Sequence, residues 1–231
     1  MYTFIIGSCR VKRFRMFISD SEIKKSIGIC QHHVHNPFEI EQLLNWIVSG
    51  DFSEAELFYN FHNSISTEKI KLPDDYYTNV KKSFEMADRI YIEISGLKRF
   101  NLKVNEKKYE CNQTAIEYLQ KNKSTLVDQV ETQISTPDDI FVSLANIREI
   151  VKHKQLIVVP HYSWKTGDKS MESRDLLRKY VVEGCRALNI PIVDPDACIS
   201  KLGKNLACID SSHYTIRFEK LIALFYSKGF V

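Results

Sequence analysis

The stretch Thr3-Phe4-Ile5-Ile6-Gly7-Ser8-Cys9 decides the fold that we expect for this chain of 231 residues. Its first four residues lean apolar and have the length typical of a buried strand. Gly7 marks the place where the chain must turn. A hydroxyl and a thiol, on Ser8 and Cys9, then follow at the carboxyl end of that strand. Open α/β sheets bind their ligands at this end, so the sequence predicts a functional site directly after the first strand.

Strand-like and helix-like segments alternate along the rest of the chain. The further strands that we expect are short apolar runs, at 90–94, 155–159 and 190–193, with a shorter one near 28–30. The expected helices have apolar residues at helical spacing, over 37–48, 74–86, 140–152, 174–188 and 214–226. Strands separated by helices form a parallel sheet covered on both faces. We therefore predict an α/β fold, a three-layer α/β/α arrangement with a central, mostly parallel sheet.

The middle of the chain, residues 98–139, has a different composition. It is polar and rich in Lys, Asn, Gln and Glu, which predicts a helical or partly extended elaboration over the sheet. Residues 103–109 could form a small hairpin. The acidic pair that follows Pro137 favours the start of a helix. Because the chain shows no internal repeat and no low-complexity linker, we predict one domain over residues 1–231.

Composition excludes several classes of protein. The hydrophobic fraction of 44% and the charged fraction of 26% are ordinary for a globular domain. No apolar run approaches the ~20 residues of a membrane span, and the first residues do not resemble a secretory signal. The six scattered cysteines lack a C-x-x-C pair and favour thiols in a reducing compartment, so we expect a cytoplasmic protein. A net charge of +3 does not indicate a nucleic-acid partner, and the sequence leaves the oligomeric state open.

A candidate base and the carboxylate that would orient it stand near the other end of the chain, in Asp-Ser-Ser-His at 210–213. Acyl transfer needs a nucleophile, a base within hydrogen-bond reach and an orienting carboxylate. Residues three apart in a turn project to the same side, so one loop can supply both Asp210 and His213. With Ser8 or Cys9 they would form a triad in the order nucleophile, Asp, His. The alternative is that Asp210, or the residue after it, only caps the last helix.

These two blocks resemble a known superfamily. Gly7-Ser8-Cys9 is similar to the Gly-Asp-Ser block of the SGNH (GDSL-type) hydrolases, and Asp210-x-x-His213 to their terminal Asp-x-x-His block. The similarity is closer to the GSC-bearing branch, including GSCFA-like proteins, whose Asn-Pro stretch resembles residues 36–40. A looser similarity links the chain to cysteine-dependent acetyltransferases of polysaccharide biosynthesis. The resemblance implies an SGNH-type fold and ester chemistry.

Either Ser8 or Cys9 can be the attacking group. Counted from Gly7, the SGNH serine falls on Cys9, and Ser8 takes the place of the intervening Asp. A thiol is the better nucleophile at neutral pH, especially near a helix amino terminus with basic neighbours. Ser8 would need stronger activation by His213, so we favour Cys9. The alternative is a buried, inert Cys9 and a Ser8 that caps the following helix.

Oxyanion or substrate-binding groups are expected from four places. Backbone N–H groups around Cys9 and Arg10 are natural donors. Gly96 stands where SGNH enzymes carry a Gly-x-Asn block, but this chain has no Asn at the matching place. Asn36 could donate from another loop, or could equally cap a helix. His161 follows the strand expected at 155–159 and could line the pocket.

A cluster of His32, His33 and His35 raises the question of a metal site. Adjacent side chains of an extended segment point apart, and no Cys or acidic neighbour completes a familiar zinc spacing. We therefore expect no metal.

Charged residues near the expected site have two readings each. Glu93 lies inside an apolar strand and could orient the site or bond a neighbouring Arg or the backbone; we favour the second. The basic run Arg10, Lys12, Arg13 and Arg15 could be a solvated helix face or could attract phosphate groups, such as those of coenzyme A or a nucleotide-linked sugar.

The function predicted from these features is an ester hydrolase or O-acyltransferase that works through an acyl-enzyme. Its substrate would be a small-molecule or glycan ester, with no required cofactor and with acyl-CoA as one acyl donor. The alternative is a non-catalytic α/β module that binds a phosphate-bearing ligand in the same crevice. The sequence does not decide between hydrolase and transferase.

Overall fold

The computed structural model describes residues 1–8, 10, 24–53, 74–104, 106–121, 129–162, 165–166, 169–170, 172–209 and 213–228. The strands are β1 (Thr3–Gly7), β2 (Ile27–His33), β3 (Arg89–Ile94), β4 (Lys98–Val104), β5 (Lys107–Cys111), β6 (Val130–Ile134), β7 (Gln155–Pro160), β8 (Lys165–Thr166) and β9 (Lys169–Ser170). The helices are α3 (Pro37–Ser49), α5 (Tyr76–Glu85), α6 (Gln113–Lys121), α7 (Pro137–Ile150), α8 (Glu172–Ala187), α9 (Pro195–Leu202), α10 (Lys204–Ala207) and α11 (Ile216–Lys228). No helix in these ranges is long and apolar enough to cross a membrane.

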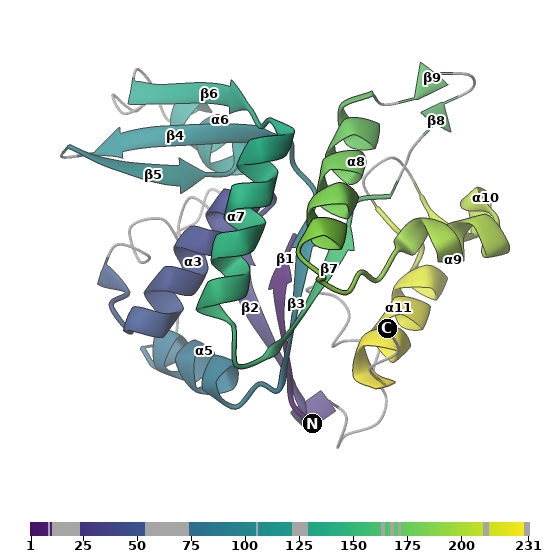
Figure 1. The fold of residues 1–231 in the computed structure, drawn as a ribbon, viewed down its shortest axis with the longest axis horizontal. Coiled ribbons are helices and arrows are strands. Elements are labelled where there is room, and N and C mark those ends of the chain that lie inside the picture. The colour runs from purple at the N-terminus through teal and green to yellow at the C-terminus, as the bar shows by residue number, and fades with distance from the viewer. Residues whose placement is uncertain are drawn as a thin grey trace.

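The central sheet consists of four parallel strands in the order β2-β1-β3-β7 (Figure 1). The apolar run that opens the chain forms β1, which lies in the interior of the sheet and is buried along its whole length. Because all four strands run the same way, their carboxyl ends meet at one edge. The predicted α/β fold with a mostly parallel sheet is confirmed.

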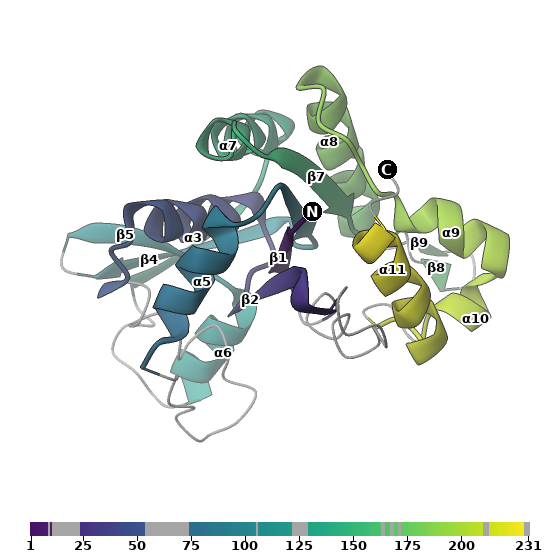
Figure 2. The same ribbon diagram turned by 90° about the horizontal axis from the view of Figure 1, so that it is seen from below.

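Helices cover both faces of this sheet, and the alternation of side chains along each strand determines which face they meet. Phe4 and Ile6 of β1 belong to the core under α3, α5, α7 and α8. Ile5, between them, belongs to the core under α9, α10 and α11. Figure 2 shows the strands between α3 and α5 on one side and α11 on the other. Both faces of the strands are therefore buried, which explains their nearly continuous apolar sequences.

The strand expected at 190–193 is shorter than predicted. It makes one parallel bridge, between Ile192 and Val158 of β7, supported by hydrogen bonds from Val158 N to Pro191 O and from Val193 N to Val158 O. Pro191 has no N–H to extend the ladder, and α9 begins soon after at Pro195. The structure thus has a single bridge beside β7 where the sequence predicts a strand of four residues, so the predicted extent is wrong.

The polar middle of the chain forms a second sheet. The antiparallel strands run in the order β5-β4-β6, and the hairpin of β4 and β5 turns at Glu106, whose φ is 68°. This sheet lies beyond the upper end of the central sheet in Figure 1. Buried side chains from it, such as Leu102 and Tyr109, belong to the same apolar cluster as Phe4. The predicted hairpin is confirmed, although its strands are longer than expected.

The start of α7 agrees with the sequence. Thr136 caps the helix in a capping box with Asp139, and Pro137 takes the first position. The Asp139 carboxylate accepts hydrogen bonds from the backbone N–H and hydroxyl of Thr136, which lower its pKa.

Candidate functional site

Ser8 and Glu93 meet at the carboxyl edge of the central sheet. Ser8 directly follows β1, and Glu93 is the last residue but one of β3, the neighbouring strand. One oxygen of the Glu93 carboxylate, Oε2, accepts hydrogen bonds from the Ser8 backbone N–H (3.0 Å) and from its hydroxyl (2.5 Å). Both side chains are buried. The expectation that Glu93 bonds neighbouring groups is therefore confirmed.

Arg10 extends this cluster to a third strand. Its Nε lies 2.7 Å from Oε1 of Glu93, in an ion pair whose side chains are 4% and 2% exposed. Its Nη1 lies 2.8 Å from Nε2 of His161, the residue after β7. The other ring nitrogen of His161, Nδ1, lies 2.7 Å from the carbonyl oxygen of Tyr162. Since a carbonyl only accepts, Nδ1 carries the proton and Nε2 accepts from Arg10.

His161 is held in its neutral form. Burial is the main cause and the Arg10 charge the second, and together they place the pKa of His161 well below its usual value. His161 directly follows β7, the strand end at which it was predicted, and it contacts Arg10 there.

Two tyrosines connect this cluster with the far end of the chain. The guanidinium carbon of Arg10 lies 5.7 Å from the ring centre of Tyr162 and 5.7 Å from that of Tyr214. The two rings lie 5.0 Å apart, and both are buried. Tyr214 directly follows His213, so the residues next to the two predicted catalytic blocks are in contact.

The structure describes two members of the predicted triad set. Ser8 is buried and bonded to Glu93. His213 is exposed, in the segment that precedes α11, and its carbonyl accepts a hydrogen bond from Ile209 N at 2.9 Å. Cys9 and Asp210 lie outside the described residues, as does Ser211, the other residue expected to cap the last helix. The triad therefore stays a prediction.

The expected oxyanion donors have other partners. The backbone N–H of Arg10 donates to the Ser8 hydroxyl oxygen at 3.3 Å. The Gly96 N–H donates to the His35 carbonyl at 2.7 Å, and a Cβ on Gly96 would lie 3.2 Å from the His35 Cβ. This close approach explains why the position suits glycine. The oxyanion role of these groups stays a prediction.

Asn36 caps α3, the alternative that the sequence left open. Its side-chain oxygen accepts from Glu39 N at 3.0 Å, and its amide nitrogen donates to Glu39 Oε1 at 2.5 Å and to Lys98 O at 3.3 Å. Both amide hydrogens thus have acceptors.

The histidine cluster lies on and just after β2. His32 is buried and lies near Tyr76 and Tyr77, with ring centres 6.1 and 6.0 Å away. Within the described part of the chain, no group of three or more His, Cys, Asp or Glu residues could hold a metal ion.

Sequence reasoning missed the partners of Arg10. A signal for them does exist, because the dipeptide His-Tyr occurs at 161–162 and again at 213–214. In both places the tyrosine turns inward to Arg10.

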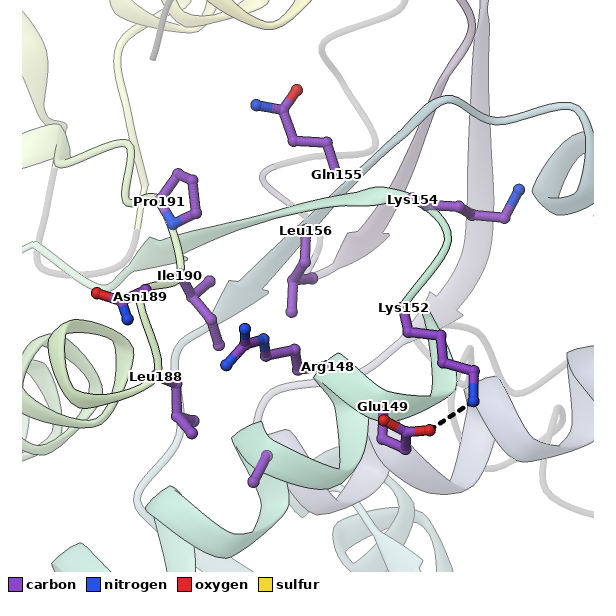
Figure 3. Close-up of a pocket in the computed structure, with 11 residues that line it drawn as sticks. Arg148, Glu149, Lys152, Lys154, Gln155, Leu156, Leu188, Asn189, Ile190 and Pro191 are labelled. Atoms are coloured by element: carbon purple, nitrogen blue, oxygen red, sulfur yellow. Dashed lines mark hydrogen bonds and ion pairs between the residues drawn. The ribbon is translucent and has the colours of Figure 1, made fainter.

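A cavity of about 480 Å³ lies at the opposite edge of the sheet, where β7 begins (Figure 3). Its wall includes Gln155 and Leu156 at the start of β7, Arg148 of α7 and Asn189. Lys152 on its rim pairs with Glu149 at 2.6 Å. The cavity is thus separate from the Ser8–Glu93 cluster.

Comparison with known families and curated proteins gives one match. A family model described as the TviD N-terminal domain matches residues 106–225, a span that includes His161, Asp210 and His213. No curated protein matches the chain.

Several solved structures have a similar fold. Two mutants of Axe2 from Geobacillus stearothermophilus, described as an acetyl-xylooligosaccharide esterase and an acetylxylan esterase, each give a TM-score of 0.50 at 11% identity, over 100% of this chain and 94% of theirs. A member of the lipolytic G-D-S-L family from Veillonella parvula gives 0.49 at 10% identity, over 100% of this chain and 98% of its own. At this identity the likeness to Axe2 shows the fold alone.

Proposed function

The chain belongs to the TviD N-terminal domain family, and we propose that it is an enzyme that cleaves or transfers esters through an acyl-enzyme. Cys9 is the nucleophile, His213 the general base and acid, and Asp210 the carboxylate that orients His213. We also assign the chain to the GSC-bearing branch of the SGNH hydrolases. The fold that it shares with Axe2, itself described as an acetylxylan esterase, supports the proposal.

One observation carries the proposal: Arg10 contacts Tyr214. Arg10 directly follows the proposed nucleophile, and Tyr214 directly follows the proposed base, more than 200 residues away in sequence. A guanidinium 5.7 Å from the centre of a buried ring holds these two backbone segments near each other. Such an arrangement favours a nucleophile and a base that act together.

The hydrogen bonds of Ser8 favour Cys9 as the nucleophile. The Ser8 hydroxyl donates a hydrogen bond to Glu93 at 2.5 Å. It accepts hydrogen bonds from N and Nε of Arg10, both at 3.3 Å. A nucleophilic serine needs a base that takes its proton and an oxygen that can approach the carbonyl carbon. The carboxylate that faces Ser8 is paired with Arg10, and the hydroxyl is buried. Ser8 therefore suits a structural role beside the nucleophile.

The proposed reaction has two halves. In the first, His213 accepts the thiol proton of Cys9 as the sulfur attacks the acyl carbonyl carbon, and then donates this proton to the departing alcohol oxygen. In the second, His213 takes a proton from water or from an acceptor hydroxyl, whose oxygen attacks the thioester; the Cys9 sulfur leaves and recovers a proton from His213. Asp210 stays ionised and stabilises the imidazolium.

Thiol alkylation and ester turnover test this function. We expect iodoacetamide to label Cys9 fast at neutral pH, His213→Ala to abolish the fast labelling, and Cys9→Ala to abolish hydrolysis of p-nitrophenyl acetate. Ser8→Ala should keep measurable turnover. Loss of turnover in Ser8→Ala, with turnover retained in Cys9→Ala, would assign the attack to Ser8. Slow, equal labelling of all cysteines without turnover would favour a non-catalytic binding module.

Four of the five other cysteines provide a slow background for this experiment. Burial raises the pKa of Cys185 to about 12 and that of Cys208 to about 11. It also raises the pKa of Cys111 and that of Cys198. Because only the thiolate reacts with iodoacetamide, these four thiols should react slowly at neutral pH.

Coenzyme A binding separates transferase from hydrolase. Arg10 is buried against Glu93, but the basic residues that follow it in the sequence, Lys12, Arg13 and Arg15, suit the phosphates of acyl-CoA as an acyl donor. We expect a transferase to bind coenzyme A in a titration and to acylate Cys9 from acetyl-CoA. Absence of both, with p-nitrophenyl acetate turnover intact, would identify a hydrolase.

A further inference from the structure

We propose that Glu93 is a positioning residue, whose carboxylate holds Ser8 and Arg10, the two neighbours of Cys9, and thereby supports the reaction of Cys9 with His213. The proposal rests on the function proposed above. Its evidence lies in Ser8, Arg10, Glu93 and the contacts among them.

The two oxygens of the Glu93 carboxylate bind different neighbours of Cys9. Oε2 holds Ser8 twice, through the backbone N–H at 3.0 Å and the hydroxyl at 2.5 Å. Oε1 holds the Arg10 side chain, whose Nε lies 2.7 Å away. Arg10 in turn donates to the Ser8 oxygen from its backbone N and its Nε. The neighbours of Cys9 on both sides are thus fixed to a single carboxylate.

Burial makes this clamp stiff. Ser8, Arg10 and Glu93 are each at most 4% exposed. Water does not compete strongly for hydrogen bonds in such a place, and charged partners strengthen them. Glu93 itself is anchored in a central strand that pairs with β1 and β7 on its two sides. The clamp therefore fixes Ser8 and Arg10, the two neighbours of Cys9, relative to a rigid strand.

Arg10 links the residues held by Glu93 to the segment of His213, the proposed base. Its guanidinium bonds His161 at 2.8 Å and lies over the ring of Tyr214, the neighbour of His213. Loss of the Glu93 carboxylate should therefore let the nucleophile segment move relative to the segment of the base. A misplacement of about 1 Å can cost about 100-fold in rate.

The test compares Glu93→Gln with a matched control, Glu110→Gln. Glu110 forms an ion pair with Arg99 in the second sheet, so the same substitution breaks an Arg–Glu pair away from the cluster. For each protein we measure the rate constant of Cys9 alkylation by iodoacetamide across pH, and kcat and KM for p-nitrophenyl acetate.

For Glu93→Gln we expect the alkylation profile to move to higher pH and kcat to fall about 10- to 100-fold with KM nearly unchanged. The control should keep the profile and kcat of the wild type. The direction of the shift separates the explanations. Loss of a negative charge alone stabilises a nearby thiolate and moves the profile to lower pH. A shift to higher pH therefore reports a thiol that has lost its imidazolium partner.

An unchanged profile, or a shift to lower pH, would overturn the positioning role while fast labelling of wild-type Cys9 still supports the enzyme. Slow labelling of Cys9 in the wild type would overturn the proposed function itself. Should Glu93→Gln not fold, Ser8→Ala provides the same readout. It removes the hydroxyl bond to Oε2 but keeps the Arg10–Glu93 pair, and it should also shift the profile to higher pH.

Discussion

Two buried glutamates near the carboxyl edge of the central sheet bind partners of different kinds. Glu93, in β3, faces the guanidinium of Arg10; it thus connects β3 with the residues that follow β1 and, through Arg10, with His161 after β7. Glu39 accepts hydrogen bonds from neutral donors of its own segment, the His35 N–H at 3.0 Å and the Asn36 amide. Burial raises the pKa of Glu39 well above its usual value. A charged pair thus joins distant segments, whereas the neutral contacts organise one helix start.

The largest expected effect comes from removing the charge opposite Glu93. Arg10→Met leaves a buried carboxylate without its counter-charge, which typically costs about 3–5 kcal/mol. Urea unfolding followed by circular dichroism measures the loss. In the double variant Arg10→Met, Glu93→Gln a neutral amide replaces the carboxylate, so part of the stability should return. A loss below about 1 kcal/mol in the single variant, the range of exposed pairs, would contradict the charged clamp.

A smaller effect is expected where neutral contacts dominate. Asn36→Ala removes the cap of α3 and should cost about 1–2 kcal/mol, measured by the same unfolding experiment. Asn36→Asp, which retains a capping oxygen, should recover part of the loss. If Asn36 only caps the helix, kcat for p-nitrophenyl acetate should hardly change in either variant. A fall in kcat of about 10²–10³ would instead assign Asn36 to the oxyanion site.

The smallest expected effect concerns the pH dependence of stability, on which two residues act in opposite directions. His161 has a lowered pKa in the folded state, so the unfolded chain binds more protons below its ordinary pKa near 6.5, and stability falls as the pH decreases from there. Glu39 has a raised pKa, so the folded chain binds more protons above about 4.5, and stability falls as the pH increases. Each slope approaches about 1.4 kcal/mol per pH unit at most. Between about pH 4.5 and 6.5 the two oppose each other.

Single variants separate the two slopes. Relative to the wild type, His161→Gln should lose less stability as the pH decreases below about 6.5, and Glu39→Gln should lose less as the pH rises above about 4.5. Unfolding free energies from urea titrations at several pH values test both signs. Equal slopes in the variants and the wild type would mean that neither residue titrates differently in the two states.

The architecture could be predicted from local patterns. Continuous apolar runs such as Thr3–Gly7 and Gln155–Pro160 identified strands buried on both faces, and helical spacing identified the helices between them. The second sheet was foreseen only as a polar elaboration with a hairpin, because its half-exposed strands have a weak pattern. The strand predicted at 190–193 was too long because Pro191, among its apolar residues, has no N–H for the ladder.

The sequence alone shows that Ser8 and Cys9 follow the first strand, that an Asp-x-x-His block lies near the far end, and that Glu93 needs a partner in an apolar strand. The three-dimensional packing identifies this partner as Arg10 and shows that Arg10 also reaches His161 and Tyr214. Strand and helix patterns arise between residues close in the chain, so a sequence displays them. The contacts of Arg10 join residues up to 204 positions apart, and they form only once the parallel strands bring their carboxyl ends to one edge.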